Sequence, residues 1–362
     1  MMWHLRAWLL ITLFFGTGVV AGFAGGAEEE PPPPRLRLAT VVTETASSVP
    51  YAEVVAGVRR AVDEHERIAL TEYVVSSAGE LAERVNALTN AGQTDIIVTA
   101  GQEGARAAVN APDGDTRFLV FDAVVVGDPR VRSVGVNHRE AAFLAGHAVG
   151  LVFEDTGDGA RTAAAGGDGA APGGDGARAT IVVADTGALI EEVIRPAFAL
   201  GVHSLAPAVD IDLMYLRPDF SDDALRRIVG QKQTDAFLVL ADGGMETLAT
   251  AVGNHVAHAS WMNRYSADRP DAGMVTRSGV DLEAIAYRRA TAAIADSLPF
   301  GEAEVIALSN EALSFEIDER QLPGPDRSAR AQRLREMQRR IETGDVELLM
   351  PERVILERTS TP

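Results

Sequence analysis

The segment that most constrains the fold of this chain covers residues 94–150. It contains two continuous apolar runs and one alternating run, all of strand length, at residues 96–99, 118–121 and 131–136, followed by a predicted helix at 140–149. Continuous apolar runs between helices are typical of strands that are covered on both faces. The segment therefore predicts a parallel sheet with helices packed on it.

Polar residues follow two of these predicted strands. Gly101 and Gln102 come after the first, and Asp122 comes directly after the second. In open α/β sheets, ligands bind beyond the carboxyl ends of the strands. Gln102 and Asp122 are therefore candidate ligand contacts, with a turn-capping role as the alternative for Asp122.

Two short motifs in this segment also carry a family resemblance. The first is Phe121-Asp122-Ala123-Val124 at a strand end, and the second is Phe143-Leu144-Ala145-Gly146 at the start of the next helix. With these motifs the chain resembles, over roughly residues 36–351, the basic membrane protein family of ABC-importer substrate-binding proteins, which includes nucleoside-binding lipoproteins. The resemblance implies an α/β fold of the type I periplasmic-binding-protein class. In that fold, two doubly wound parallel-sheet lobes, joined by a multi-strand hinge, close on a small ligand.

The resemblance also implies how the chain divides between the lobes. Residues 36–137 and 264–306 would form the first lobe, residues 138–263 and 307–351 the second, and residues 352–362 a tail. Further strands are expected at 36–42, 68–75, 180–184, 208–215, 235–240 and 313–317, and helices at 51–64, 77–91, 189–201, 222–231, 247–258, 280–297 and 329–342.

Residues 154–179 differ in composition from the rest of the chain. Gly, Ala and Asp dominate, and the sequence GGDGA occurs twice. Such a segment cannot bury an apolar core, so we predict a disordered surface insertion within the second lobe. It is not a phosphate-binding loop, because no Lys-Ser/Thr pair follows the glycines.

The N-terminus has the pattern of an export signal. His4 and Arg6 precede an uncharged run over residues 7–27, which ends in small residues that suit cleavage. The run is also long enough to remain as an uncleaved membrane anchor. Relatives are usually anchored through an acylated cysteine, but this chain has no cysteine. We expect a protein that is periplasmic or held at the outer face of the cytoplasmic membrane, with a proline-rich spacer at 28–35.

The first-lobe ligand contacts that the resemblance implies lie around the loop after the first strand. Thr45 and Ser47 would offer hydroxyl contacts, and Tyr51 would provide a stacking platform. The alternative is a helix-capping cluster of hydroxyl residues with an exposed tyrosine. Asp122 would hold a ligand hydroxyl.

In the second lobe the resemblance implies contacts at five positions. They are Arg195, Asp242, Gly243, Asn263 and Arg277. Arg195 follows the position of a family aromatic and would stack through its guanidinium plane, or would simply be solvated. Gly243 would let the backbone approach the ligand, and Arg277 falls near a ligand-binding lysine of the family.

Composition and missing motifs exclude several other classes of function. The net charge of −19 argues against nucleic-acid binding and against polybasic membrane binding. The chain has no G-x-S-x-G, H-E-x-x-H or Walker motif, and His255 and His258 are its only close histidine pair. We interpret that pair as surface positions of a helix rather than as metal ligands. We therefore predict no catalytic residue, no metal and no cofactor.

These features predict a binding protein that delivers a small polar ligand, a nucleoside, to an ABC permease. A sugar-binding protein is one alternative. A second is a membrane-tethered sensing or interaction protein with the same fold, which presents its lobes to a receptor. A third is a type I fold with an empty cleft.

Overall fold

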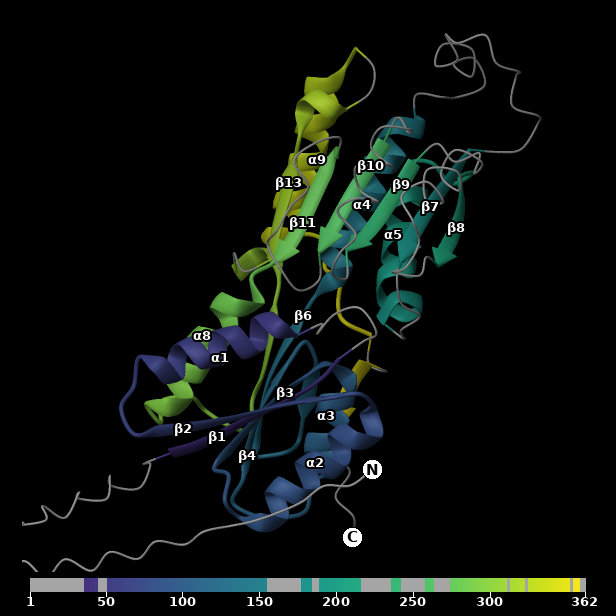
Figure 1. The fold of residues 1–362 in the computed structure, drawn as a ribbon. Helices are drawn as coiled ribbons and strands as arrows, with labels where there is room; N and C mark the ends of the chain where they lie inside the picture. Colours follow the sequence, from purple (N-terminus) through teal and green to yellow (C-terminus); the bar gives the residue numbers. More distant parts are fainter. Residues whose placement is uncertain are drawn as a thin grey trace, which may run out of the picture. The chain divides into compact units, whose positions relative to one another are not determined.

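The structure is a computed structural model that describes residues 36–44, 51–154, 177–183, 189–215, 236–241, 258–263, 274–310, 313–322, 325–351 and 354–358. All of these residues belong to one compact unit, Pro34–Pro362. Within them the chain forms two six-stranded sheets and one two-stranded sheet (Figure 1).

The first sheet is parallel throughout and has the order β12-β6-β4-β3-β1-β2. Its strands are β1 (Leu36–Thr43), β2 (Ile68–Val75), β3 (Ile96–Ala100), β4 (Arg117–Phe121), β6 (Val131–Val136) and β12 (Ala303–Ile306). The helices that accompany it are α1 (Ala52–Asp63), α2 (Ala78–Ala91), α3 (Gly101–Asn110) and α8 (Leu282–Ile294).

Both faces of this sheet are apolar, as expected for a parallel sheet between helices. Ile96 and Val98 of β3 pack in one cluster with buried residues of α1 and α8. Ile97, which lies between them in the strand, packs in a second cluster with α2 and α3. Alternate residues of one strand thus contribute to two separate cores, which explains why this strand is continuously apolar.

The second sheet has the order β13-β11-β10-β9-β7-β8 and is parallel except that β13 runs antiparallel to β11. Its strands are β7 (Arg178–Val183), β8 (Asp210–Tyr215), β9 (Ala236–Ala241), β10 (His258–Asn263), β11 (Thr276–Val280) and β13 (Leu313–Ile317). They are accompanied by α4 (His138–Glu154), a π-helix (Ile190–Ile194), α5 (Arg195–His203) and α9 (Arg327–Glu342). Helix α4 packs against both α5 and α9.

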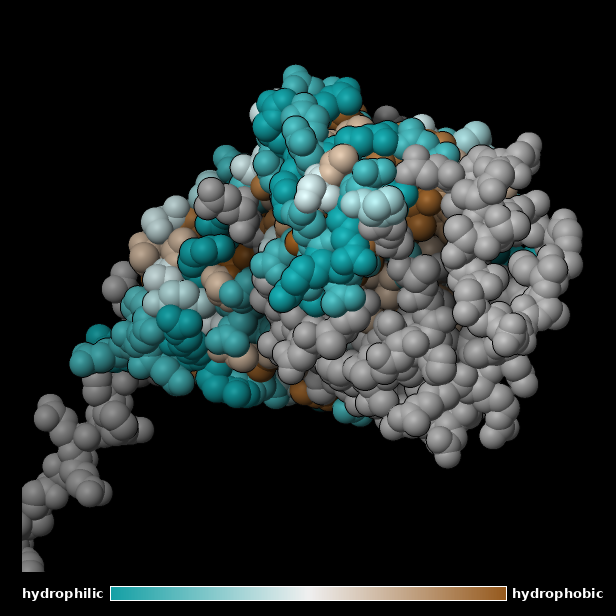
Figure 2. All heavy atoms as spheres, turned by 90° about the horizontal axis from the view of Figure 1, so that it is seen from above, coloured by the Kyte–Doolittle hydropathy of each residue, from teal (hydrophilic) through white to brown (hydrophobic). Residues whose placement is uncertain are grey.

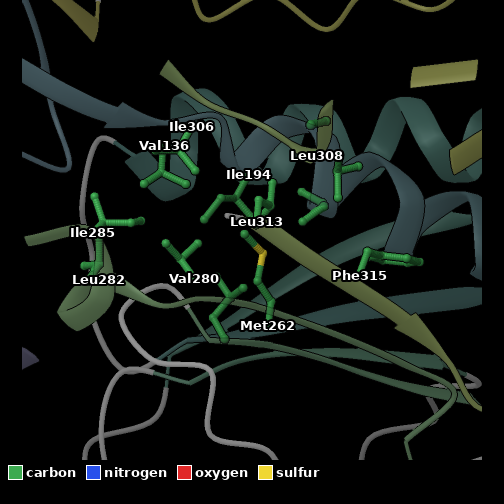
Figure 3. Packing of buried hydrophobic residues seen from close by; sticks show 14 of the residues in the cluster. Val136, Ile194, Met262, Val280, Leu282, Ile285, Ile306, Leu308, Leu313 and Phe315 are labelled. Carbon is green, nitrogen blue, oxygen red and sulfur yellow. The ribbon is translucent and has the colours of Figure 1, made fainter. Parts of the chain in front are cut away.

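Among the described elements, the chain passes three times between the two six-stranded sheets and once more from the second sheet to the two-stranded sheet, which makes four crossings. It crosses after β6, after β11, and between β12 and β13. After α9 it returns to form β14 (Ile355–Glu357), which pairs with β5 (Val124–Val126). Several apolar residues of these crossings are buried in one cluster with Met262 of β10, including Val136, Val280, Ile306 and Leu313 (Figure 3).

Two polar residues at the first crossing tie three of the crossings together. The backbone amide of Asn137 donates to the carbonyl oxygen of Ile306 at 2.8 Å, and its side-chain Nδ2 donates to that of Leu348 at 2.9 Å. One turn later, Glu140 Oε2 accepts from the amide of Leu308 at 2.7 Å. We call Asn137 and Glu140 the hinge pair.

Most of the predicted strands and helices are present with boundaries within a few residues, and the predicted fold class is confirmed. Strands β10 and β11 and the short strands β5, β12 and β14 were not among the predicted strands. The helix predicted at 222–231 lies outside the described residues, as do residues 247–257 of the helix predicted at 247–258, the signal or anchor at 1–27, the spacer at 28–35 and most of the insertion.

Four predictions need correction. Strand β11 belongs to the second sheet, so the chain returns to the first sheet after Val280 and not near residue 264. The proposed tail contains β14, which is paired with β5. Glu154 ends α4, whereas Arg178 and Ala179 lie in β7, so neither end of the predicted insertion is disordered. His258 starts β10 and is 1% exposed, which excludes a surface helix position.

The surface of the described part agrees with the acidic, charged composition. Hydrophilic residues predominate where that part is visible in Figure 2, and hydrophobic residues are scattered. No helix among the described residues has the length and apolar character needed to cross a membrane.

Candidate functional site

The candidate site lies where four neighbouring strands of the first sheet end. Strands β6, β4, β3 and β1 are adjacent and parallel, so their carboxyl ends meet at one edge. Asp122 follows β4, Gly101 follows β3 and His138 lies just beyond β6. Tyr51, at the start of α1, comes from the segment after β1. This is the edge at which α/β sheets bind ligands.

Asp122 is the centre of this group. Its backbone has a φ of 53°, in the left-handed region that aspartate tolerates better than most residues, and its amide donates to the carbonyl oxygen of Val134 at 2.8 Å. The side chain is only 5% exposed. Oδ1 lies 3.1 Å from His138 Nε2, and Oδ2 accepts a hydrogen bond from the Tyr51 hydroxyl at 3.3 Å. The turn after β4 therefore holds the carboxylate between two partners.

Tyr51 is held against the end of β3. Gly101 has a φ of 71°, and a Cβ at this position would lie 2.6 Å from the Tyr51 hydroxyl oxygen. Glycine is thus required twice here, by its backbone conformation and by the close approach of the tyrosine ring. Tyr51 caps no backbone amide of α1 with its side chain, and it is partly buried rather than exposed.

His138 is the residue of this group that the sequence did not reveal. Its side chain is 1% exposed, and its Nδ1 has no hydrogen-bond partner in the part of the chain that the structure describes. The sequence predicted a strand that ends at residue 136 and a helix that begins at residue 140, and His138 lies between them without an assigned role. The available signal was its position just after a predicted strand.

The two residues of the hinge pair, Asn137 and Glu140, flank His138 in the sequence. Burial raises the pKa of Glu140 above its usual value, although hydrogen bonds from the Leu308 amide and the Asn137 side chain act in the opposite direction. The candidate site is therefore joined in sequence to the residues that hold three interlobe crossings.

The other predicted contacts are placed differently. Gln102 Nε2 donates to the carbonyl oxygen of Val354 at 3.0 Å and so holds the returning C-terminal segment. Arg195 is exposed and pairs with Glu191 at 3.1 Å, one turn earlier. Thr45, Ser47, Asp242 and Gly243 lie outside the described residues.

Asn263 and Arg277 lie at different levels of the second sheet. Asn263 is the last residue of β10 and is 9% exposed, so it does lie at a carboxyl edge. Arg277 is the second residue of β11, in register with Trp261 and Glu316. It lies three residues before the carboxyl end of β11. The structure therefore brings Tyr51 and Asp122 together but does not place Arg277 at the strand edge with Asn263.

The second sheet contains a buried polar cluster of another kind. His258 Nε2 lies 3.3 Å from Ser260 Oγ, which accepts a hydrogen bond from the Thr276 hydroxyl at 2.7 Å. These residues occupy the amino-terminal halves of β10 and β11. Burial lowers the pKa of His258 to about 3. Across the described residues, no group of three or more acidic, histidine or cysteine side chains could hold a metal ion.

Two parallel-sheet lobes, four crossings between them and a polar group at a carboxyl strand edge define a bilobal ligand-binding protein. Residues 38–338 match the family model for Bmp, described as ABC transporter substrate-binding protein PnrA-like. The chain belongs to this family. No curated protein matches the sequence.

Solved structures of similar fold come from several organisms. An ABC transporter solute-binding protein from Aeropyrum pernix K1 has a TM-score of 0.63 and 14% identity, over 88% of this chain and 94% of its own. A 5-methylthioribose transporter solute-binding protein from Thermotoga lettingae TMO, in complex with 5-methylthioribose, has a TM-score of 0.55 and 14% identity, covering 89% and 98% of the two chains. An ABC transporter solute-binding protein from Burkholderia graminis C4D1M, in complex with D-arabinose, has a TM-score of 0.56 and 11% identity, covering 82% and 100%.

The protein is therefore a substrate-binding protein of an ABC transporter, from a family that acts outside the cytoplasm, and not an enzyme. The family implies a small-molecule ligand and a permease partner.

Proposed function

We propose that the protein binds a nucleoside between its lobes and delivers it to an ABC permease. The observation that carries this proposal is the Asp122 carboxylate, held at the carboxyl strand edge by Tyr51 and His138. A carboxylate in such a position accepts hydrogen bonds from sugar hydroxyls. Two proteins of similar fold were crystallised with 5-methylthioribose and D-arabinose, which supports a ligand that contains a pentose.

The base of the nucleoside would lie against Tyr51, whose ring is fixed by Gly101 and by its hydrogen bond to Asp122. Asn263, Asp242 and Gly243 are the proposed contacts from the second lobe. Gln102, Arg195 and Arg277 remain predictions with less support, because each has a protein partner or lies away from the strand edge.

Export completes the proposal. The uncharged run at 7–27 would act as a signal peptide, or as an anchor if it stays uncleaved, and would place the protein in the periplasm or at the outer face of the cytoplasmic membrane.

A ligand screen followed by calorimetry tests the proposal. Adenosine, guanosine, their free bases, D-ribose and D-arabinose would be compared by thermal shift, because a ligand that binds only the native state raises its stability. We expect nucleosides to give the largest shifts. An Asp122→Ala change should then weaken nucleoside binding by roughly ten- to a hundred-fold, because a charge-assisted hydrogen bond is lost.

Asp63→Ala is the matched control, since Asp63 is an exposed carboxylate at the end of α1. It should leave affinity unchanged. Binding of a pentose but of no nucleoside would favour the sugar-binding alternative, which the two ligand complexes above also support. An unchanged dissociation constant in the Asp122→Ala protein would place the ligand elsewhere.

A further inference from the structure

His138 does not contact the ligand in the proposed function, but it contacts Asp122, the residue on which that function depends. An ionised carboxylate can only accept hydrogen bonds, so in this pair His138 Nε2 carries the proton and donates to Asp122 Oδ1. The Tyr51 hydroxyl donates to Oδ2. Each oxygen of Asp122 therefore has one protein donor and keeps a further acceptor position.

A carboxylate with two free acceptor positions can bind a ligand that has two donor groups on adjacent atoms. Neighbouring hydroxyls of a pentose ring have this arrangement, because each hydroxyl can donate to one oxygen. A single hydroxyl would use only one of the two positions. The orientation of the carboxylate plane therefore decides whether a hydroxyl pair is favoured over a single hydroxyl.

The orientation of the carboxylate is accompanied by two energetically unfavourable features. Asp122 adopts a left-handed backbone conformation, and His138 keeps a buried Nδ1 without a partner in the described residues. Unfavourable conformations and buried unpaired polar atoms are uncommon, and both tend to occur at functional sites. Here they occur on the two members of one hydrogen-bonded pair.

Burial makes the pair rigid. The side chains of His138 and Asp122 are 1% and 5% exposed, so water competes little for their hydrogen bond. A mobile carboxylate would lose orientational freedom on binding a ligand, whereas one that is already oriented does not.

We propose that His138 is a positioning residue that orients Asp122 to accept both members of a pair of adjacent hydroxyls, and that it thereby sets a preference for ribonucleosides over 2′-deoxyribonucleosides. This inference rests on the proposed function, because it requires Asp122 to contact the ligand. It adds a residue and a ligand chemistry to that proposal.

Four variants test the inference by calorimetry with adenosine and 2′-deoxyadenosine. His138→Leu removes the donor at similar volume, and His138→Gln keeps an N–H donor of similar reach. Asp122→Ala, and its combination with His138→Leu, complete a double-mutant cycle. Thermal unfolding without ligand shows that each variant is folded.

We expect wild-type protein to prefer adenosine by about ten-fold, the value of one good hydrogen bond. His138→Leu should weaken adenosine binding by about ten-fold and reduce the preference to near unity, and His138→Gln should restore most of it. In the Asp122→Ala background, His138→Leu should have no further effect. The ring ¹⁵N signals of His138 should show a proton on Nε2 in wild-type protein and change in Asp122→Ala.

Each contrary result is distinguishable. If His138→Leu weakens the binding of adenosine and of 2′-deoxyadenosine equally, His138 has only a structural role and the inference is wrong. The proposed function stands in that case. If the preference is unchanged in His138→Leu but lost in Asp122→Ala, the inference is again wrong. If neither adenosine nor guanosine binds wild-type protein, the proposed function fails, and D-ribose and 2-deoxy-D-ribose provide the same hydroxyl comparison. Absence of binding by all four probes would overturn both.

Discussion

Two buried histidines contact residues of different sheets, and they differ in what surrounds them. His138 lies just beyond the carboxyl end of β6, against the Asp122 carboxylate. His258 lies at the amino end of β10, against the hydroxyl of Ser260. Each is 1% exposed. Burial alone therefore does not separate a candidate binding residue from a structural one.

The two histidines differ in the side chain that each one contacts and in the end of the strand at which each one lies. A histidine next to a carboxylate at the carboxyl edge belongs to the candidate binding site, because α/β sheets bind ligands at this edge. A histidine next to hydroxyls at the amino end belongs to a neutral hydrogen-bonded cluster within the sheet. The comparison predicts that changes around His258 alter stability only, and that changes around His138 also alter ligand affinity.

The largest expected effect concerns acid stability and His258. Its pKa in the folded protein, about 3, lies below the ordinary value of 6.5, so the unfolded chain binds this proton first as the pH falls. Stability is therefore complete above pH 6.5 and is lost as the pH falls towards 3. Between pH 7 and pH 4.5 the loss attributable to His258 is roughly 2 to 3 kcal/mol.

Urea unfolding of wild-type protein and a His258→Leu variant at the two pH values measures this loss. The variant should lose roughly 2 to 3 kcal/mol less than wild type over the same interval. His147, whose pKa is lowered to about 4 mainly by burial, is present in both proteins, so its contribution cancels. An equal loss in the two proteins would show that His258 is not held neutral, and the comparison would fail.

An intermediate effect is expected at Gly101, with Gly92 as its matched control. Both residues have positive φ, 71° and 60°, so alanine at either position costs about 1 kcal/mol in backbone strain. At Gly101 the new Cβ would also meet the Tyr51 hydroxyl, whereas at Gly92 no atom lies within 4 Å. Gly101→Ala should therefore cost about 2 kcal/mol in total.

Ligand titration of the two alanine variants sharpens the comparison. Gly101→Ala should weaken nucleoside binding because it displaces Tyr51, and Gly92→Ala should not. If both variants bind the ligand as wild type does, the position of Tyr51 at the strand edge has no bearing on ligand binding.

The smallest effect is expected from removing one hydroxyl in each half. Tyr51→Phe removes the donor to Asp122, and Thr276→Val removes the donor to Ser260. Each should cost about 1 kcal/mol of unfolding free energy. Only Tyr51→Phe should weaken nucleoside binding, by roughly three- to ten-fold. A loss of affinity in Thr276→Val would show that the second cluster also acts on the ligand.

The sequence predicts those parts of the molecule whose signal is local. The continuous apolar runs of β3 and β4 identified buried parallel strands, and Asp122 was found because it directly follows one of them. His138 was missed because its importance comes from β6 lying beside β4 in the sheet, and strand order is not visible in a run of residues.

Pairing between strands that are distant in sequence also explains the other differences between the predicted and the observed structure. Strand β11 joins the second sheet because it pairs with β10 on one side and with β13 on the other. The three-residue strand β14 exists because it pairs with β5 and because Arg358 binds Asp128 at 2.8 Å. His258 follows a segment with helical periodicity, and only its place beside β9 and its burial show that it starts a strand.

The four crossings have a consequence for how the chain can reach its folded state. Strand β6 receives its outer neighbour, β12, only from residues 303–306, and β5 receives β14 only from residues 355–357. During synthesis or secretion the N-terminal part of the chain appears first. The outer edge of β6 therefore stays unpaired until residues 303–306 have also appeared. Unpaired strand edges recruit other chains, so fragments that end before Ala303 should aggregate rather than fold as an independent lobe. Holding the whole chain unfolded until it is complete avoids that outcome.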